Sequence, residues 1–570
     1  MTLRGHLLIL ACLLIGQWGS PNMLMAADNS GYLPGEEART YLRQRLNRAV
    51  ADQPRLCRGD VLCSALLMRS FYKRHDFNPV WSTKGRLFKN ITEFAAVLES
   101  AGADGLQPAD YHLFSINLMQ VMLARLNGDE SIFSPVEQVD LDLLLTDAFL
   151  LYGGHLLNGK INPEDYNEKW LSTNNDIDLT KILDQALAGQ GIKNVLAELR
   201  PPQPGYQRMM TAITSLRNLV EKGGWPKLPT RFILREGMRH PAVSILRQRL
   251  MLSGDYAMPG KTDEDYFDGS LAAAVSFFQM RHGLGIDGVA GRRTLAALNV
   301  SAAYRLQQLE LNMERWRWLP RNLGRRHLLV NIPDFSLQVI DNSQEILRMR
   351  VVAGKPHRST PIFSDMVEYL VINPYWYLPE TIVVEDMVPL ILSDPEYLQK
   401  KGIKVFAAGS DEQLELDQTT IDWTGISKEK LPYKLRQDFG PSNALGRIKI
   451  VFPNRFSVYM HDTPSQGLFK QNSRDFSSGC IRLEKPVELT TYLLEGNPLW
   501  NREAILAAID SGVRQVIALA EPIPIHIIYM TAWADKQGVI HFRDDIYGWD
   551  KLLEDALFIP KHPLLVANYL

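Results

Sequence analysis

One imidazole and one thiol stand out in the C-terminal half of the sequence: His461, in Tyr459-Met460-His461-Asp462-Thr463, and Cys480, in Ser477-Ser478-Gly479-Cys480-Ile481-Arg482. A thiol is a modest nucleophile near neutral pH, because its reference pKa is about 8.5. A neighbouring imidazole can take its proton and hold a thiolate–imidazolium pair. We therefore expect Cys480 to act as a nucleophile and His461 as its base. A buried structural cysteine beside an unrelated histidine is the alternative.

The residues around this pair predict how the chain positions it. Phe456 to Met460 alternates as a strand does and carries His461 at its end. Ser-Ser-Gly before Cys480 is typical of a tight turn where the backbone approaches a substrate closely. We expect the N–H groups of Gly479 and Cys480 to face an oxyanion that forms during the reaction.

This run resembles the active-site signature of the L,D-transpeptidases, whose YkuD-type catalytic domain has a histidine, a similar loop and then Ser/Thr-x-Gly-Cys. The usual signature has His before Gly-Cys and Asn two residues after the Cys, where this sequence has Ser478 and Arg482. Both departures resemble the long, scaffold-containing (YcbB-like) branch of the family.

The resemblance implies a reaction on peptidoglycan stem peptides. Cys480 would attack the carbonyl of the third stem residue, a diamino acid, and expel the terminal D-Ala. An amine from a second stem would then resolve the thioester into a 3→3 cross-link. A backbone carbonyl, at Tyr459 or Asp462, would fix the tautomer of the histidine. Arg482 would hold a stem carboxylate or form a structural ion pair, and Ser478 would contact the substrate.

Three other outcomes fit the same residues. If water resolves the thioester, the site is an L,D-carboxypeptidase, and if the acceptor is an outer-membrane protein, that protein is joined to the wall. A non-catalytic wall-binding scaffold is the third. The expected partners are stem peptides and glycan, with cell-wall synthesis proteins and a covalent β-lactam (carbapenem) inhibitor as further candidates.

Composition narrows the class of protein. The chain has 570 residues, which is room for about three or four domains, with 22% charged residues and a formal net charge of −2. No basic stripe stands out for phosphates, so we expect no nucleic-acid partner. No His, Cys and Asp cluster has zinc-ligand spacing and no His-Glu-x-x-His occurs, so we expect no metal and no cofactor.

The first 27 residues predict export. A basic start, an apolar run over 7–16 and small residues up to Ala27 are typical of a secretory signal peptide. The run is too short to span a bilayer, which needs roughly 20 residues. We expect a periplasmic protein, with an uncleaved N-terminal membrane anchor as the alternative. Cys57 and Cys63 can pair in such an oxidising compartment if their geometry allows it.

The expected fold class is multidomain α+β. Helical spacing and the resemblance predict a helical scaffold domain over 28–235. Residues 238–300 predict a small three-helix unit, whose Asp287 to Thr294 phrase resembles that of a peptidoglycan-binding domain; a plain helix bundle is the alternative. Residues 301–325 predict a linker helix and 549–570 a C-terminal tail.

Residues 326–548 predict a mostly-β catalytic domain of sandwich or barrel type. Short alternating runs predict strands over 329–332, 336–340, 346–352, 367–372 and 448–452, and a last hairpin of 523–532 with 539–542. An insertion at about 379–442 interrupts them. The resemblance implies a capping subdomain there, which we expect to act as a lid; a solvated insertion is the alternative.

Overall fold

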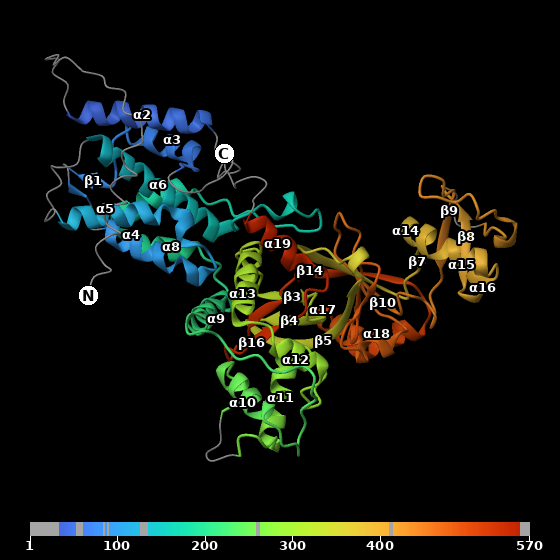
Figure 1. The fold of residues 1–570 in the computed structure, drawn as a ribbon. Helices are drawn as coiled ribbons and strands as arrows, with labels where there is room; N and C mark the ends of the chain where they lie inside the picture. Colours follow the sequence, from blue (N-terminus) through green and yellow to red (C-terminus); the bar gives the residue numbers. More distant parts are fainter. Residues whose placement is uncertain are drawn as a thin grey trace.

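The computed structural model describes residues 34–52, 61–83, 86–87, 90–125, 135–257, 263–409 and 414–558. Figure 1 shows a helical region, a small helical unit, a central β domain and an outlying insertion. The expected fold class is thereby confirmed. The predicted signal peptide and Cys57 lie outside the described residues, and Cys63 takes part in a disulfide. In the described part of the chain, no helix has the length and apolar character needed to cross a membrane.

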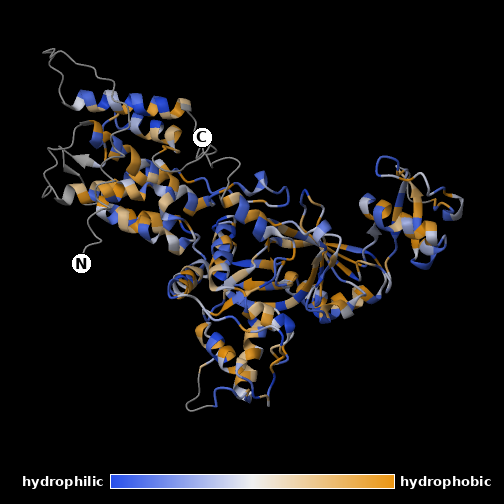
Figure 2. Cartoon of the chain, viewed as in Figure 1, coloured by the Kyte–Doolittle hydropathy of each residue, from blue (hydrophilic) through white to orange (hydrophobic). Residues whose placement is uncertain are grey.

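The N-terminal helical region packs around α6 (Pro135–Asn158), which is buried along most of its second half. Such a helix needs neighbours on several sides. They are α2 (Pro34–Asp52), α3 (Ala65–Arg74), α4 (Asn90–Glu99), α5 (Leu113–Arg125), α7 (Leu179–Gln185) and α8 (Ile192–Leu199), with the short strands β1 (Ser82–Thr83) and β2 (Arg86–Leu87). Trp81, Phe94 and Phe149 stack at the centre of this core. Figure 2 shows the apolar residues gathered inside each body of the molecule.

The small helical unit consists of α10 (Ala242–Leu252), α11 (Gly269–Arg281) and α12 (Arg292–Leu298) around a separate core. The Gln279 side chain explains the Asp287 to Thr294 phrase. Its amide donates to Asp287 and Thr294, and its oxygen accepts the N–H of Gly288. The phrase therefore folds the loop onto α11.

One helix, α13 (Ala302–Arg317), joins these bodies to the β domain. Ser301 caps its first turn by accepting the Tyr304 N–H. Glu314 accepts the N–H groups of Lys160 and Ile161 from the helical region. The helix packs against α9 (Pro204–Glu221), the hairpin of β15 (Ala532–Ala534) with β16 (Ile540–Phe542), and α19 (Trp549–Phe558). Helix α13 therefore packs between the domains and connects them.

The β domain is a nine-stranded sheet that closes on itself, because β4 pairs with β5 as well as with β3. The ring order is β5 (Gln344–Gly354), β13 (Ile481–Leu483), β11 (Met460–His461), β10 (Ile448–Val451), β6 (Phe363–Ile372), β14 (Gln515–Ile528), β3 (Arg326–Asn331) and β4 (Ser336–Asp341), with β12 (Asp475–Ser477) also on β5. Helices α17 (Pro486–Leu493) and α18 (Arg502–Asp510) add to its core. Closure leaves the short β11 and β13 flanked by partners on both sides.

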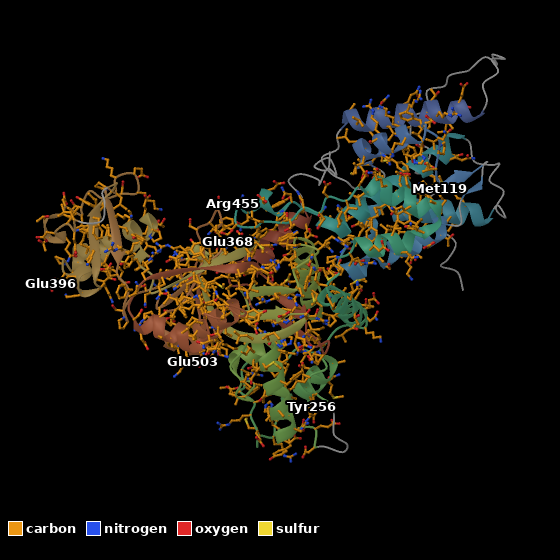
Figure 3. All side chains as sticks on the ribbon, turned by 180° about the vertical axis from the view of Figure 1, so that it is seen from behind. Met119, Tyr256, Glu368, Glu396, Arg455 and Glu503 are labelled. Carbon is orange, nitrogen blue, oxygen red and sulfur yellow. The ribbon has the colours of Figure 1, made fainter. Side chains whose placement is uncertain are left out.

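The insertion lies between β6 and β10, which are antiparallel neighbours. It contains β7 (Trp376–Tyr377), α14 (Glu380–Ile382), a π-helical turn over Val383–Met387, α15 (Val388–Ser393), α16 (Tyr397–Lys400), β8 (Ile403–Ala407) and β9 (Tyr433–Gln437). These elements bury their own apolar core, so the insertion, called the cap below, is a folded subdomain. In Figure 3, Glu396 of the cap and Met119 of the helical region lie at opposite ends of the molecule.

Three local predictions are wrong. Residues 456–459 are not a strand, because the Asn454 side chain binds the N–H groups of Phe456 and Val458 and folds a turn there, with Ser457 at φ 55°. The run from 523 belongs to β14, and the last hairpin is only β15 with β16. The expected tail begins as α19, since its apolar face with Trp549 and Leu553 enters the β-domain core.

Candidate active site

The closed sheet brings the two predicted catalytic residues onto neighbouring strands. Strands β11 and β13 run parallel, with His461 opposite Arg482 and Met460 opposite Ile481. Cys480 directly precedes β13, beside Tyr459. The Ile481 N–H donates to the Tyr459 carbonyl at 3.1 Å, which fixes this register. Thiol and imidazole are therefore diagonal neighbours across one strand pair.

A main-chain carbonyl fixes the tautomer of His461. Its Nδ1 lies 2.5 Å from the Asp462 carbonyl oxygen, and since a carbonyl only accepts, Nδ1 carries the proton. Nε2 is then the unprotonated nitrogen and is able to accept a proton. Of the two carbonyls expected for this role, Tyr459 is occupied by Ile481, and Asp462 performs it.

The surroundings of His461 disfavour its charged form. The residue is 5% exposed. Burial lowers the pKa of His461 to about 3, and the nearby charges of Arg482 and Lys449 act in the same direction. The imidazole is consequently neutral at physiological pH.

Cys480 is partly exposed as a residue. Burial raises the pKa of its thiol, against the opposing effect of hydrogen bonds from Tyr459 and the charges of Lys449 and Arg482. With His461, this favours a neutral thiol–imidazole pair in the free protein. The thiolate–imidazolium pair expected from the sequence is therefore not the resting state, because burial costs both ions their hydration.

Lys449 is a site residue that the sequence analysis missed. It lies on β10 opposite His461, and its Nζ sits 3.8 Å from the centre of the Tyr459 ring. Burial lowers its pKa, while its interaction with Cys480 raises it. In the sequence, Lys449 is a lone lysine between the apolar residues Ile448 and Ile450 of a predicted strand, and this pattern could have indicated it.

Hydrogen bonds hold the turn before the nucleophile in one shape. Gly479 has φ +114°, a conformation that side-chain-bearing residues rarely adopt. Its N–H donates to Ser477 Oγ, whose hydroxyl donates to the Cys480 carbonyl. Thr360 donates to the Gly479 carbonyl at 2.8 Å. The Gly479 N–H is therefore already bonded within the turn. Of the two N–H groups expected to face an oxyanion, the other is that of Cys480, and oxyanion binding stays a prediction.

The two residues expected to contact the substrate, Arg482 and Ser478, differ in whether their side chains are already bonded to other residues. No ion-pair partner for Arg482 exists among the described residues, and its buried Nε has no hydrogen-bond partner there. This favours the carboxylate-binding alternative over a structural ion pair. Ser478 is exposed, and its Oγ accepts a hydrogen bond from Arg358 at 3.1 Å.

Arg358 connects the nucleophile turn to the cap. It belongs to a 3₁₀ turn (Pro356–Arg358) and forms ion pairs with Glu385 and Asp386 of the π-helical turn in the cap. One guanidinium thus contacts both the cap and the residue two before Cys480.

The carboxylate of Asp462 supports the loop before β10. It accepts the N–H groups of Arg447 and Thr463, and a Cβ on Gly446 would collide with it. Across the described ranges, no group of three or more His, Cys, Asp or Glu side chains is arranged to hold a metal ion.

Three family models match the chain. Residues 325–500 match the L,D-transpeptidase catalytic domain, which contains β3 to α17 and both catalytic candidates. Residues 66–213 match a scaffold domain, and residues 239–298 match a domain described as "Putative peptidoglycan binding domain".

A curated relative from Haemophilus influenzae, named "Putative L,D-transpeptidase", is 32% identical over 250 residues, which is 44% of this chain and 49% of the relative. The chain thus spans about half the length of the curated relative that it matches. Among solved structures, the similar ones include an L,D-transpeptidase from Xylanimonas cellulosilytica (15% identity, 53% of this chain and 98% of that chain, TM-score 0.17). Another is an L,D-transpeptidase in complex with imipenem (14% identity, 36% and 59%, TM-score 0.17). The assignment rests on the family models and the curated relative: the chain carries an L,D-transpeptidase catalytic domain, preceded by a scaffold domain and a peptidoglycan-binding domain.

Proposed function

We propose that the protein is a peptidoglycan L,D-transpeptidase that forms 3→3 cross-links through a thioester on Cys480. The observation that carries this proposal is the neutral His461, whose Nδ1–H is held by the Asp462 carbonyl, on the strand beside a partly exposed thiol. A tether without catalysis has no use for this arrangement.

In the first half-reaction, the Cys480 thiol gives its proton to His461 Nε2 as the sulfur attacks the carbonyl carbon of the third stem residue. The C–N bond to the terminal D-Ala then breaks. The leaving amine takes the proton from Nε2, and the acyl group remains on sulfur. Lys449 and the Tyr459 donors stabilise the developing thiolate.

In the second half-reaction, an amine of another stem loses its proton to His461 Nε2 and attacks the thioester. The C–S bond breaks and the proton returns to sulfur, which restores the resting pair. Water in place of the amine yields a carboxypeptidase. The cap, held at Arg358 beside the nucleophile turn, is suited to keep water out.

The Cys480 thiol can also attack the strained ring of a β-lactam. The enzyme cannot easily release the acyl group that then remains on the sulfur. We expect incubation with a carbapenem to add the mass of one inhibitor to the wild-type protein and none to Cys480→Ala. An absent adduct on the wild type, or an equal adduct on the variant, would contradict the mechanism.

The composition of the digested cell wall distinguishes the proposed transpeptidase from the carboxypeptidase and scaffold alternatives. Overproduction in cells should raise 3→3 linked dimers in digested sacculi, and Cys480→Ala should not. A rise in tripeptides alone would indicate the carboxypeptidase, and an unchanged profile the scaffold alternative. Because this substrate lies outside the cytoplasm, we also propose export through residues 1–27 to the periplasm.

A further inference from the structure

A large cleft separates the small helical unit from the β domain. Its volume is about 1070 Å³. The walls come from three parts of the chain, and the lining includes Gly283, Arg293, Arg305, Asp334, Arg474, Arg543 and Asp550. In Figure 1 the helices α10 to α12 lie beside α13 and the β domain. The cleft is bordered there by α13, the loop before β4, residues 472–474 before β12 and residues 543–546 after β16.

Arg305 of α13 lines this cleft without a close ion pair among the described residues. It is 8% exposed, donates from Nη1 to Gln308 at 2.8 Å and lies over the Phe542 ring at 4.5 Å. Its Nε has no partner, and among the described residues no carboxylate forms an ion pair with it. Burial lowers its pKa to about 10, and the charge of Arg281 adds to that effect. A buried guanidinium in this state gains from an anionic ligand.

Arg474, from the loop before β12, is a second arginine of the cleft lining. Arg474 donates to the carbonyls of Val351, Gln471 and Phe335 and, within the described ranges, has no ion-pair partner. Burial lowers its pKa to about 10. Planar guanidinium groups suit the binding of carboxylates.

Four carboxylates line the cleft. Asp545 accepts a hydrogen bond from Tyr529, and Asp544 attracts Arg305 without forming an ion pair with it. Asp334 pairs with Arg543 and Arg348. Asp550 pairs with Arg315 and accepts from Thr531. The lining side chains therefore comprise five cations, Lys227, Arg293, Arg305, Arg474 and Arg543, against four carboxylates, which is a small excess of positive charge.

The two walls are fixed to each other, so the cleft is preformed. Arg281 of α11 donates to the Ile540 carbonyl at 3.0 Å, and Arg543 donates back to the Arg281 carbonyl at 2.9 Å. Gly283 packs so closely on the Arg543 side chain that any Cβ there would collide with it. A preformed site loses less free energy on ordering when a ligand binds.

We propose that this cleft binds a second stem peptide of the wall through its carboxylates, with Arg305 and Arg474 as the anchoring cations. A stem peptide is a chain of a few residues with several free carboxylates, which matches a cleft lined by several cations. Arg474 directly precedes β12, and Cys480 follows six residues later, which is at most about 20 Å of extended chain. This inference rests on the proposed function. A stem bound in the cleft keeps the wall polymer near Cys480.

The test uses full-length Cys480→Ala protein and a synthetic tetrapeptide stem, as the free acid and with its carboxylates converted to amides. Titration calorimetry should show roughly tenfold or greater weakening on amidation. Arg305→Met and Arg474→Met should weaken binding of the free acid by a similar factor and leave the amide unaffected. Arg305→Lys should restore part of the loss.

The matched control is Arg249→Met, which removes a buried arginine of α10 that does not line the cleft. It should leave stem binding unchanged. Carbapenem acylation of Arg305→Met protein with Cys480 intact should proceed as in the wild type, which shows that the variant is folded and its nucleophile intact.

Stem binding that ignores Arg305→Met, or ignores amidation, would overturn the cleft proposal, as would the absence of any binding. If wild-type Cys480 reacts with the carbapenem while stem binding ignores Arg305, the cleft proposal alone fails. If Cys480 does not react, the proposed function fails.

Discussion

At the scale of single residues, the burial of His461 has a direct kinetic consequence. Its lowered pKa, about 3, means that the imidazole remains an available base well below neutral pH. The raised pKa of the Cys480 thiol means that ionisation of the sulfur improves toward alkaline pH. The two groups therefore predict a one-sided pH dependence.

We expect the rate of carbapenem acylation to rise with pH from mildly acidic to alkaline conditions, without an acidic limb near the ordinary histidine value of about 6.5. Stopped-flow fluorescence or mass spectrometry at a series of pH values measures it. A bell-shaped profile whose acidic limb lies near 6.5 would show that His461 is not the buried, neutral base described above.

His461→Ala should slow acylation by roughly 10²–10⁴-fold, which is the usual contribution of a positioned general base. Folding should be retained, as judged by an unchanged circular dichroism spectrum. Acylation at the wild-type rate would contradict the assignment of the base.

Lys449→Met should move the alkaline rise of the acylation rate to higher pH, because it removes a positive charge that stabilises the thiolate. Lys449→Arg should shift it less. The control is Lys400→Met on the outer side of the cap, which should leave the profile in place. Equal profiles for Lys449→Met and the wild type would remove Lys449 from the mechanism.

The sequence predicts Cys480 and His461 as the reacting pair, because a histidine followed by Ser-Gly-Cys is a specific pattern. It left two carbonyls open for the histidine, since the choice depends on which one Ile481 occupies across the strands. It also left out Lys449, whose role comes from a register between β10 and β11 that no local pattern contains.

At the scale of elements, the contact between the cap and the nucleophile turn depends on one arginine. Arg358 binds the cap through Glu385 and Asp386 and binds Ser478 on the other side. A cap without this contact would be free to move relative to the barrel.

Arg358→Met should therefore raise the hydrolysis of a thioester intermediate relative to its transfer to an amine, because water reaches the site more easily. Chromatography of the products from a stem peptide donor with an added amine acceptor gives this ratio. Asp394→Asn, which removes a surface ion pair on the far part of the cap, is the matched control. An unchanged ratio in Arg358→Met would argue against a lid.

Alternation predicted most strands of the barrel, since buried faces require it. It failed at 456–459, where Asn454 bonds to the main chain and replaces a strand by a turn. It also does not predict the burial of the C-terminal helix α19, because that burial depends on a core formed by distant strands.

At the scale of the whole molecule, buried neutral histidines link stability to pH. Burial lowers the pKa of His155, His282 and His526 as well as His461. Each binds a proton more readily in the unfolded chain, so stability is present above about pH 6.5 and is lost as pH falls below it.

We expect each of these histidines to cost about 1.4 kcal/mol per pH unit below its unfolded pKa of about 6.5. Calorimetric scans between neutral and mildly acidic pH should show falling transition temperatures. His526→Gln should flatten the decline of the transition that includes the barrel. A transition temperature independent of pH in this range would contradict the burial of these side chains.

The order of domains along the chain was readable from the sequence, but their docking was not. Trp170 of the helical region packs on Trp318 and Trp549, which lie far apart in sequence. Such a contact depends on surface complementarity between bodies that fold separately, and no periodicity in one segment records it.

The place where the cap leaves the barrel has a consequence for how such enzymes can diversify. The Asn373 N–H donates to the Arg447 carbonyl at 2.8 Å, so the chain departs and returns at adjoining points of one β-ladder. A turn of about two to five residues could join β6 directly to β10. We therefore expect that caps of different sequence can be grafted at these two positions while the nucleophile and its strands stay in register.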